Sequence, residues 1–89
     1  MKFVLITTQH RGVFAGYLLE ERDNGNTVVL TDARCAIRWS TTKGFLELAS
    51  DGPNSNSKIG ASAREVTLYD VTSKTVCTDQ AAKAWREAA

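Results

Sequence analysis

The sequence has few of the residues that usually build metal sites and redox sites. Among its 89 residues there are one histidine, two cysteines and one proline. Cys35 and Cys77 belong to no CxxC or Cys/His pattern, and His10 alone cannot complete a zinc site. We therefore predict no metal and no cofactor, and we interpret both thiols as reduced and buried in a cytosolic protein.

The sequence also has neither an excess of one charge nor a long hydrophobic run. Eleven basic and ten acidic side chains leave a formal net charge of +1, whereas nucleic-acid-binding domains usually carry a clear basic excess. No segment approaches the roughly 18 apolar residues that a membrane helix needs. The apolar run within residues 2–12 is shorter than the roughly 7–15 residues of a signal-peptide core. These features predict a soluble, cytoplasmic protein that binds no membrane, and they disfavour nucleic acid.

Catalytic motifs are missing as well. The phosphate-binding P-loop pattern fails on both sides of Lys58, and no GxGxxG is present. Nucleophilic catalysis needs a Cys or Ser beside a base, and a Cys35–His10 pair is geometrically conceivable but has no support from the sequence. Three aspartates stand singly, as turn or cap residues usually do: Asp32, Asp51 and Asp70. We expect a protein that is not an enzyme.

The first third of the chain predicts β-structure within one domain, residues 1–89. Residues 2–8, 13–21 and 27–31 are rich in β-branched and aromatic side chains, which favours strands. Asn24-Gly25 is the strongest short signal for a hairpin between the second and third of them. Gly16 indicates a bulge or bend.

Residues 33–39, "ARCAIRW", alternate in a way that predicts a fourth strand. One face would carry Cys35, Ile37 and Trp39, and the other Arg34, Ala36 and Arg38. We interpret this strand as half-exposed, with the basic face outward.

The pattern changes at residue 40. Thr41 or Thr42 could cap a short helix that ends at Gly52-Pro53, although "GFLEL" (44–48) leaves a strand as the alternative. Residues 54–62 read as a loop.

The C-terminal third predicts a strand over 64–71 with Val66 and Leu68 inward, then a short strand or extended segment over 74–77. A terminal helix would begin at Thr78-Asp79, with Trp85 docking it on the sheet.

These elements define an α+β fold: a mainly antiparallel curved sheet or small open barrel of about five strands, with a short middle helix and a C-terminal helix. Small SH3-like and Sm-like barrels have a comparable opening hairpin. Because such folds host many functions, the likeness decides none.

One segment combines the residue types that hold a phosphate or nucleotide. A helix N-terminus attracts anions, hydroxyls and lysines add donors, and an exposed tryptophan can stack on a base. The competing interpretation is a simple helix cap with a buried tryptophan. The candidate ligand-binding residues are Arg38, Trp39, Thr41, Thr42, Lys43, Ser57 and Lys58.

The first two predicted strands are apolar on both faces, and few helices are available to cover them. A symmetric homo-oligomer would cover the second face. The alternative is that the terminal helix covers it alone.

Several segments together resemble a small family of uncharacterised proteins of tailed bacteriophages and prophages: "KFVLITTQHRGVFAGYL", "ARCAIRW", "KGFLELA", "SKIG" and "VTLYDVTS". The resemblance supplies no catalytic or binding residues. It implies an accessory protein that acts by binding in the host cytoplasm and counters host defence, sequestering an anionic nucleotide-like signalling molecule within an oligomer. The alternatives are a protein inhibitor of a host or defence enzyme and a weak nucleic-acid binder using Arg34, Arg38 and Trp39.

Overall fold

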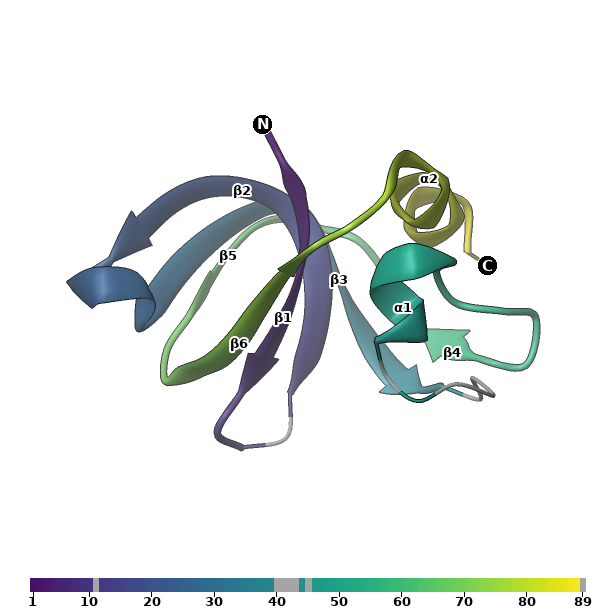
Figure 1. Ribbon diagram of the computed structural model, residues 1–89, viewed down its shortest axis with the longest axis horizontal. Helices are drawn as coiled ribbons and strands as arrows, with labels where there is room; N and C mark the ends of the chain where they lie inside the picture. The colour runs from purple at the N-terminus through teal and green to yellow at the C-terminus, as the bar shows by residue number, and fades with distance from the viewer. Residues whose placement is uncertain (11, 40–43, 45, 89) are drawn as a thin grey trace.

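A computed structural model describes residues 1–10, 12–39, 44 and 46–88. Within these described residues, six strands and two short α-helices give the predicted α+β fold (Figure 1). In chain order the elements are β1 (Phe3–Thr8), β2 (Val13–Arg22), the 3₁₀ turn η1 (Asp23–Gly25), β3 (Thr27–Arg38), α1 (Glu47–Ser50), β4 (Lys58–Ile59), β5 (Ala63–Leu68), β6 (Val71–Val76) and α2 (Asp79–Glu87). No helix formed by these residues is long and apolar enough to cross a bilayer.

The strands form one open antiparallel sheet in the order β4-β3-β2-β1-β6, and β5 pairs with β3 on the same side as β4. β5 and β6 therefore lie at opposite edges of the sheet although only two residues connect them. Figure 1 shows how β2 and β3 bend so that these edges approach each other. Of the two predicted alternatives, the structure is the open sheet.

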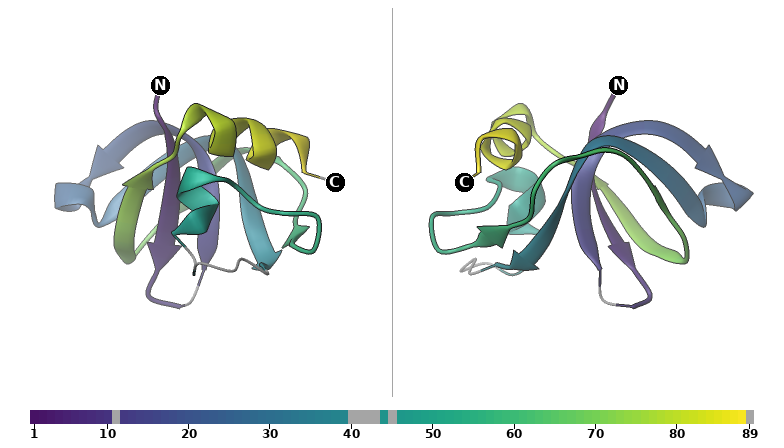
Figure 2. Two further views of the ribbon diagram at one scale, coloured as in Figure 1. Left: turned by 45° about the vertical axis from the view of Figure 1, so that its right-hand side comes forward. Right: turned by 180° about the vertical axis from the view of Figure 1, so that it is seen from behind.

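β1 is buried on both faces, as its sequence predicts. On one face Phe3 and Leu5 pack in a core with α1 and α2, which lie on the same side of the sheet (Figure 2). On the other face Val4 and Ile6 pack with residues of β3 and β5, inside the bend of the sheet. One chain thus covers both faces, so the doubly apolar strand does not require a second subunit. The homo-oligomer itself stays a prediction.

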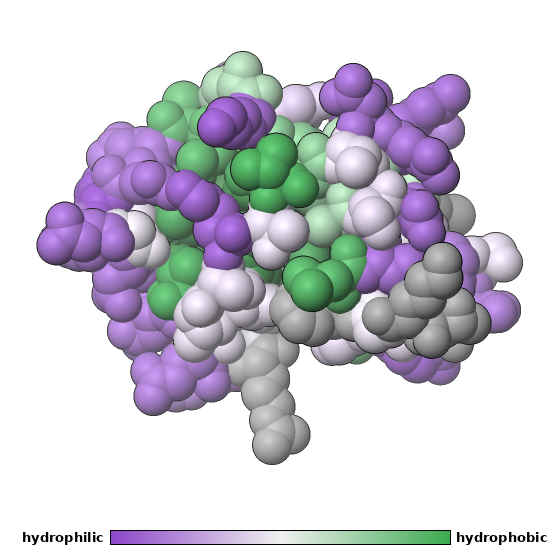
Figure 3. Space-filling view, in the orientation of Figure 1, coloured by the Kyte–Doolittle hydropathy of each residue, from purple (hydrophilic) through white to green (hydrophobic). Residues whose placement is uncertain are grey.

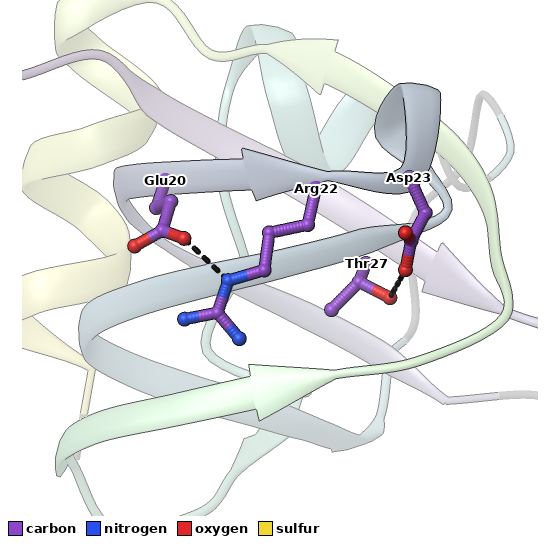
Figure 4. Close-up of polar contacts among 4 residues, drawn as sticks. All are labelled: Glu20, Arg22, Asp23 and Thr27. Atoms are coloured by element: carbon purple, nitrogen blue, oxygen red, sulfur yellow. Dashed lines mark hydrogen bonds and ion pairs between the residues drawn. The ribbon is translucent and has the colours of Figure 1, made fainter.

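The β2–β3 hairpin is where Asn24-Gly25 predicts it. Asn24 and Gly25 both adopt positive φ, 57° and 90°, which these two residue types tolerate best. Thr27 Oγ1 donates to Asp23 Oδ2 at 3.4 Å, and Arg22 pairs with Glu20 (Figure 4). The side-chain hydrogen bond from Arg22 lowers the pKa of Glu20.

Gly16 lies opposite a β-bulge, in agreement with the sequence. The β2–β3 register shifts between Ala15 and Tyr17, and the extra residue is Asp32 of β3, with a φ of 50°. A Cβ at Gly16 would come within 3.0 Å of the Thr31 carbonyl oxygen. Because the bulge lets the chain continue after Asp32, the two strands predicted over 27–31 and 33–39 are one strand, β3.

The predicted facing of the second half of β3 is wrong. Ala36 is buried under the helices, while Ile37 is 59% exposed. Arg34 also lies on the helix side, where its guanidinium reaches the end of α2. The small Ala36 side chain leaves room for the helices to pack closely, so the face predicted to be outward and basic is the one that packs against them.

The Arg34 side chain caps the C-terminal end of α2. Its Nη1 donates to the Trp85 and Ala88 carbonyl oxygens at 3.0 and 2.6 Å, and its Nε donates to the Gly60 carbonyl at 2.8 Å. The last carbonyls of a helix otherwise lack partners, and a cation suits that end.

We therefore expect Arg34→Met to lower the free energy of unfolding by about 2 kcal/mol, since charged hydrogen bonds to part-buried carbonyls are lost. Urea denaturation measures this. Arg64→Met, at an exposed position of β5, is the matched control and should change stability by less than about 0.5 kcal/mol. Equal effects of the two substitutions would contradict the capping role.

α2 begins as predicted. The Thr78 side chain accepts a hydrogen bond from the Ala81 amide, and Trp85 is completely buried between α2, α1 and the sheet. The other C-terminal predictions are confirmed in part. Val66 and Leu68 face the second core, but the strand predicted over 64–71 ends at Leu68. The segment predicted over 74–77 belongs to a longer strand, β6, which begins at Val71 and ends at Val76.

The middle helix exists but is shorter than predicted. α1 begins at Glu47 with Leu46 in the cap position, so the expectation that Thr41 or Thr42 caps it is wrong. Its end agrees with the prediction: Gly52 adopts a φ of 82°, and its amide donates to the Glu47 carbonyl oxygen. Within 54–62, predicted as a loop, Lys58 and Ile59 form β4.

Candidate anion-binding site

The structure brings two of the predicted site residues together. Arg38 at the end of β3 pairs directly with Lys58 of β4 across an antiparallel ladder, and both side chains are exposed. These residues are twenty apart in the sequence, and the loop that follows α1 returns the chain beside β3 (Figure 1). Two cations on neighbouring strands are the main feature of this site.

Like charges directly opposite each other destabilise a sheet. The ladder between β3 and β4 is short, and its register shifts between Ala36 and Arg38, which marks a bulge. Bulges re-aim side chains and are frequent beside binding sites. A bound anion would attract both side chains and so offset the repulsion between Arg38 and Lys58.

Trp39 follows Arg38 directly and is 36% exposed. The competing interpretation, a buried tryptophan, is therefore wrong, and part of the indole is available for contact. Ile37, on the other side of Arg38 in sequence, is exposed as well. The end of β3 thus presents one cation between two large apolar side chains.

Ser57 has a structural role in the turn before β4. Its hydroxyl donates to Asn54 Oδ1 at 3.1 Å, and the Asn56 amide donates to the same oxygen at 3.0 Å. The Ser57 amide donates to the Asn54 carbonyl at 3.0 Å. Ser57 also lines a cleft of about 380 Å³ that the turn forms with Ala84, Glu87 and Ala88 near the end of α2, and Lys58 does not line it.

Thr41, Thr42 and Lys43 lie outside the described residues. The sequence predicts these residues at the N-terminus of the middle helix. That helix, α1, has only four residues and carries Glu47 in its first turn. A carboxylate there opposes an anion instead of attracting it. The helix-terminus part of the predicted site therefore has no counterpart in α1.

The two cysteines are half-buried and free, less buried than expected. Burial raises the pKa of Cys77 to about 11 and also raises that of Cys35, so both thiols are neutral near pH 7. A neutral thiol is a poor nucleophile. Among the described residues, no three side chains of His, Cys, Asp or Glu gather closely enough to hold a metal ion.

Sequence reasoning missed the roles of Arg34 and Asn54. Arg34 was counted among the outward basic residues, although it caps α2. Asn54 organises the turn that delivers Lys58 to Arg38, and an Asn three residues before a Ser is an available signal for such a turn.

The fold and this surface define a small α+β protein with a basic, partly apolar sheet end. The chain belongs to the family described as Domain of unknown function (DUF6948), whose model matches residues 1–85. No curated protein and no solved structure matches the chain.

Proposed function

We propose that this protein is a non-enzymatic binding protein for an anionic, nucleotide-like molecule. The observation that carries the proposal is the Arg38–Lys58 pair, in register across β3 and β4, next to the exposed Trp39. Thr41, Thr42 and Lys43, which follow two to four residues after Trp39 in the sequence, belong to the proposal on the sequence alone. Ser57 acts through the turn that positions Lys58.

Each part of such a ligand has a counterpart at this site. Neighbouring strands lie about 4.7–4.9 Å apart, so the two cationic side chains can reach one phosphate or two adjacent ones. The indole of Trp39 provides a surface on which a base can stack, worth about 1–3 kcal/mol. Hydrogen bonds between these cations and phosphate oxygens are charge-assisted and stronger than neutral ones.

The proposed setting is the cytoplasm of an infected bacterium, where sequestering a signalling nucleotide within an oligomer would counter host defence. The support for this setting is the resemblance to tailed-phage proteins. An inhibitor of a host or defence enzyme is the second candidate, favoured by the exposed apolar side chains of Ile37 and Trp39 at the same end of β3. Nucleic acid is less favoured, because the Arg34 guanidinium is bonded to three carbonyl oxygens.

Isothermal titration calorimetry with cyclic oligonucleotides and ADP-ribose derivatives tests the proposal. We expect at least one of these to bind, and Arg38→Gln/Lys58→Gln to weaken that binding at least about tenfold. The double variant should keep or slightly raise the melting temperature, because it removes a repulsive pair. Loss of binding could then not be attributed to unfolding.

The matched control is Arg64→Gln/Lys83→Gln, which removes the same charge at exposed positions on β5 and α2. It should leave the affinity within about twofold of the unmodified protein. No heat with any compound, or equal losses in both double variants, would refute the site. Native mass spectrometry of the protein from its host adds the subunit count and the mass of any retained ligand.

A further inference from the structure

A second cleft, which is lined by none of the residues of the proposed anion site, lies where the N-terminal residues run beside α2. It has a volume of about 340 Å³ and is formed by the start of β1, the middle of β2, the end of β6 and one side of α2. Figure 3 shows apolar atoms exposed just below the N-terminus on this face of the molecule, between hydrophilic regions on either side. The sequence gives no local signal for the cleft, because its residues are spread from position 1 to position 86.

Two cations line the cleft from opposite ends of the chain, Lys2 and Arg86. The Arg86 guanidinium is oriented by the chain itself, because Nη1 donates to the Tyr17 hydroxyl at 2.8 Å. Neither cation forms an ion pair with any described residue. Both charges are therefore available to an anion in the cleft.

Apolar side chains form part of the remaining wall. The rings of Phe3 and Tyr17 meet edge to face, with centroids 5.0 Å apart and an interplanar angle of 87°. Ala82 of α2 continues this wall, and Val76 at the rim is 55% exposed. An exposed valine beside an aromatic pair offers contact to an apolar group that enters the cleft.

The charges in the cleft limit how negative an occupant can be. Asp79, in the first turn of α2, lines the same cleft as Lys2 and Arg86. The Cys77 thiol adds no charge near neutral pH, because burial raises its pKa to about 11. The lining side chains of Lys2, Arg86 and Asp79 therefore leave one net positive charge, which the carboxylate of a monoanion balances.

We propose that this cleft binds a small amphipathic monocarboxylate. Its carboxylate is held by Arg86 and Lys2, and its apolar body lies against Phe3, Tyr17 and Val76. The volume is at the lower end of the roughly 300–1,000 Å³ typical of small-molecule sites, so the ligand is a small metabolite and not a peptide. The inference does not depend on the Arg38–Lys58 site.

The test uses 3-phenylpropionate and octanoate as probes. Their binding to the full chain is measured by ¹⁵N NMR titration. We expect saturable shifts around Lys2, Tyr17, Cys77 and Arg86, with affinities near the millimolar range for such small ligands. The neutral amides of both probes should bind at least about tenfold more weakly, since the charge-assisted hydrogen bonds are lost. Shifts that are equally strong with the amides would overturn the proposal.

Variants and thiol labelling complete the experiment. Arg86→Gln should weaken both probes about tenfold, whereas Lys83→Gln, an exposed change on the same helix, should not. Saturating probe should slow alkylation of Cys77, which lines the cleft, and leave Cys35 on β3 unaffected. The proposal is overturned if neither probe gives saturable shifts up to about 10 mM, a concentration that would reveal even weak specific binding.

Discussion

Replacement of Trp85 by alanine is expected to lower the free energy of unfolding by about 3–5 kcal/mol, the usual cost of emptying a large buried aromatic site. Trp85 is fully buried and joins three parts of the fold. Its ring packs with residues of the sheet, of α1 and of α2, and its Nε1 donates to the Leu48 carbonyl oxygen at 2.9 Å. Since small domains are stable by only about 5–15 kcal/mol, this single change would remove a large part of the total.

Trp85→Phe separates the two contributions of this side chain. It keeps most of the apolar contact and leaves the Leu48 carbonyl without its donor, so we expect a loss of about 1–3 kcal/mol. Urea denaturation followed by far-ultraviolet circular dichroism measures both variants without relying on the tryptophan signal. If the alanine variant were as stable as the phenylalanine variant, the packing of α1 and α2 through Trp85 would be wrong.

The second large effect is expected for Gly52→Ala, which should lower the free energy of unfolding by about 2–4 kcal/mol. Gly52 ends α1 with a φ of 82°, where any side chain is strained. An added Cβ would also lie 2.5 Å from the Ala84 Cβ and 3.0 Å from the Ala81 carbonyl oxygen. The substitution would therefore push α2 away from α1.

Gly25→Ala is the matched control for backbone strain alone. Gly25 has a similar φ of 90°, but a Cβ there meets nothing within 4 Å. We expect this variant to lose only about 1–2 kcal/mol, the cost of the left-handed conformation. Equal melting temperatures of the two variants would show that the contact between Gly52 and α2 contributes nothing.

Local sequence signals predicted the parts of this fold that depend on neighbouring residues. Asn24-Gly25 predicts the hairpin because these two residue types favour the backbone conformation of the turn. Thr78 predicts the start of α2 because its hydroxyl accepts a hydrogen bond from an amide only three residues later. Trp85 could be assigned to the core because its helix has one apolar side.

Other features depend on contacts between distant segments and could not be predicted. The facing of Arg34 and Ala36 is decided by where α2 packs, and alternation alone does not say which face is inside. α1 begins at Glu47 because its packing against α2 and β1, not a capping residue, stabilises it. The pairing of Arg38 with Lys58 needs β4, whose two residues are too few to give a pattern.

The packing of β1 in one core with α2 also has a consequence for the synthesis of the protein. Phe3 and Leu5 leave the ribosome early, yet their partner Trp85 is added at least eighty residues later. Until α2 has emerged, one apolar face of the nascent sheet has no cover and is open to chaperones or to other nascent chains. The domain can therefore complete its folding only after nearly the whole sequence has been translated.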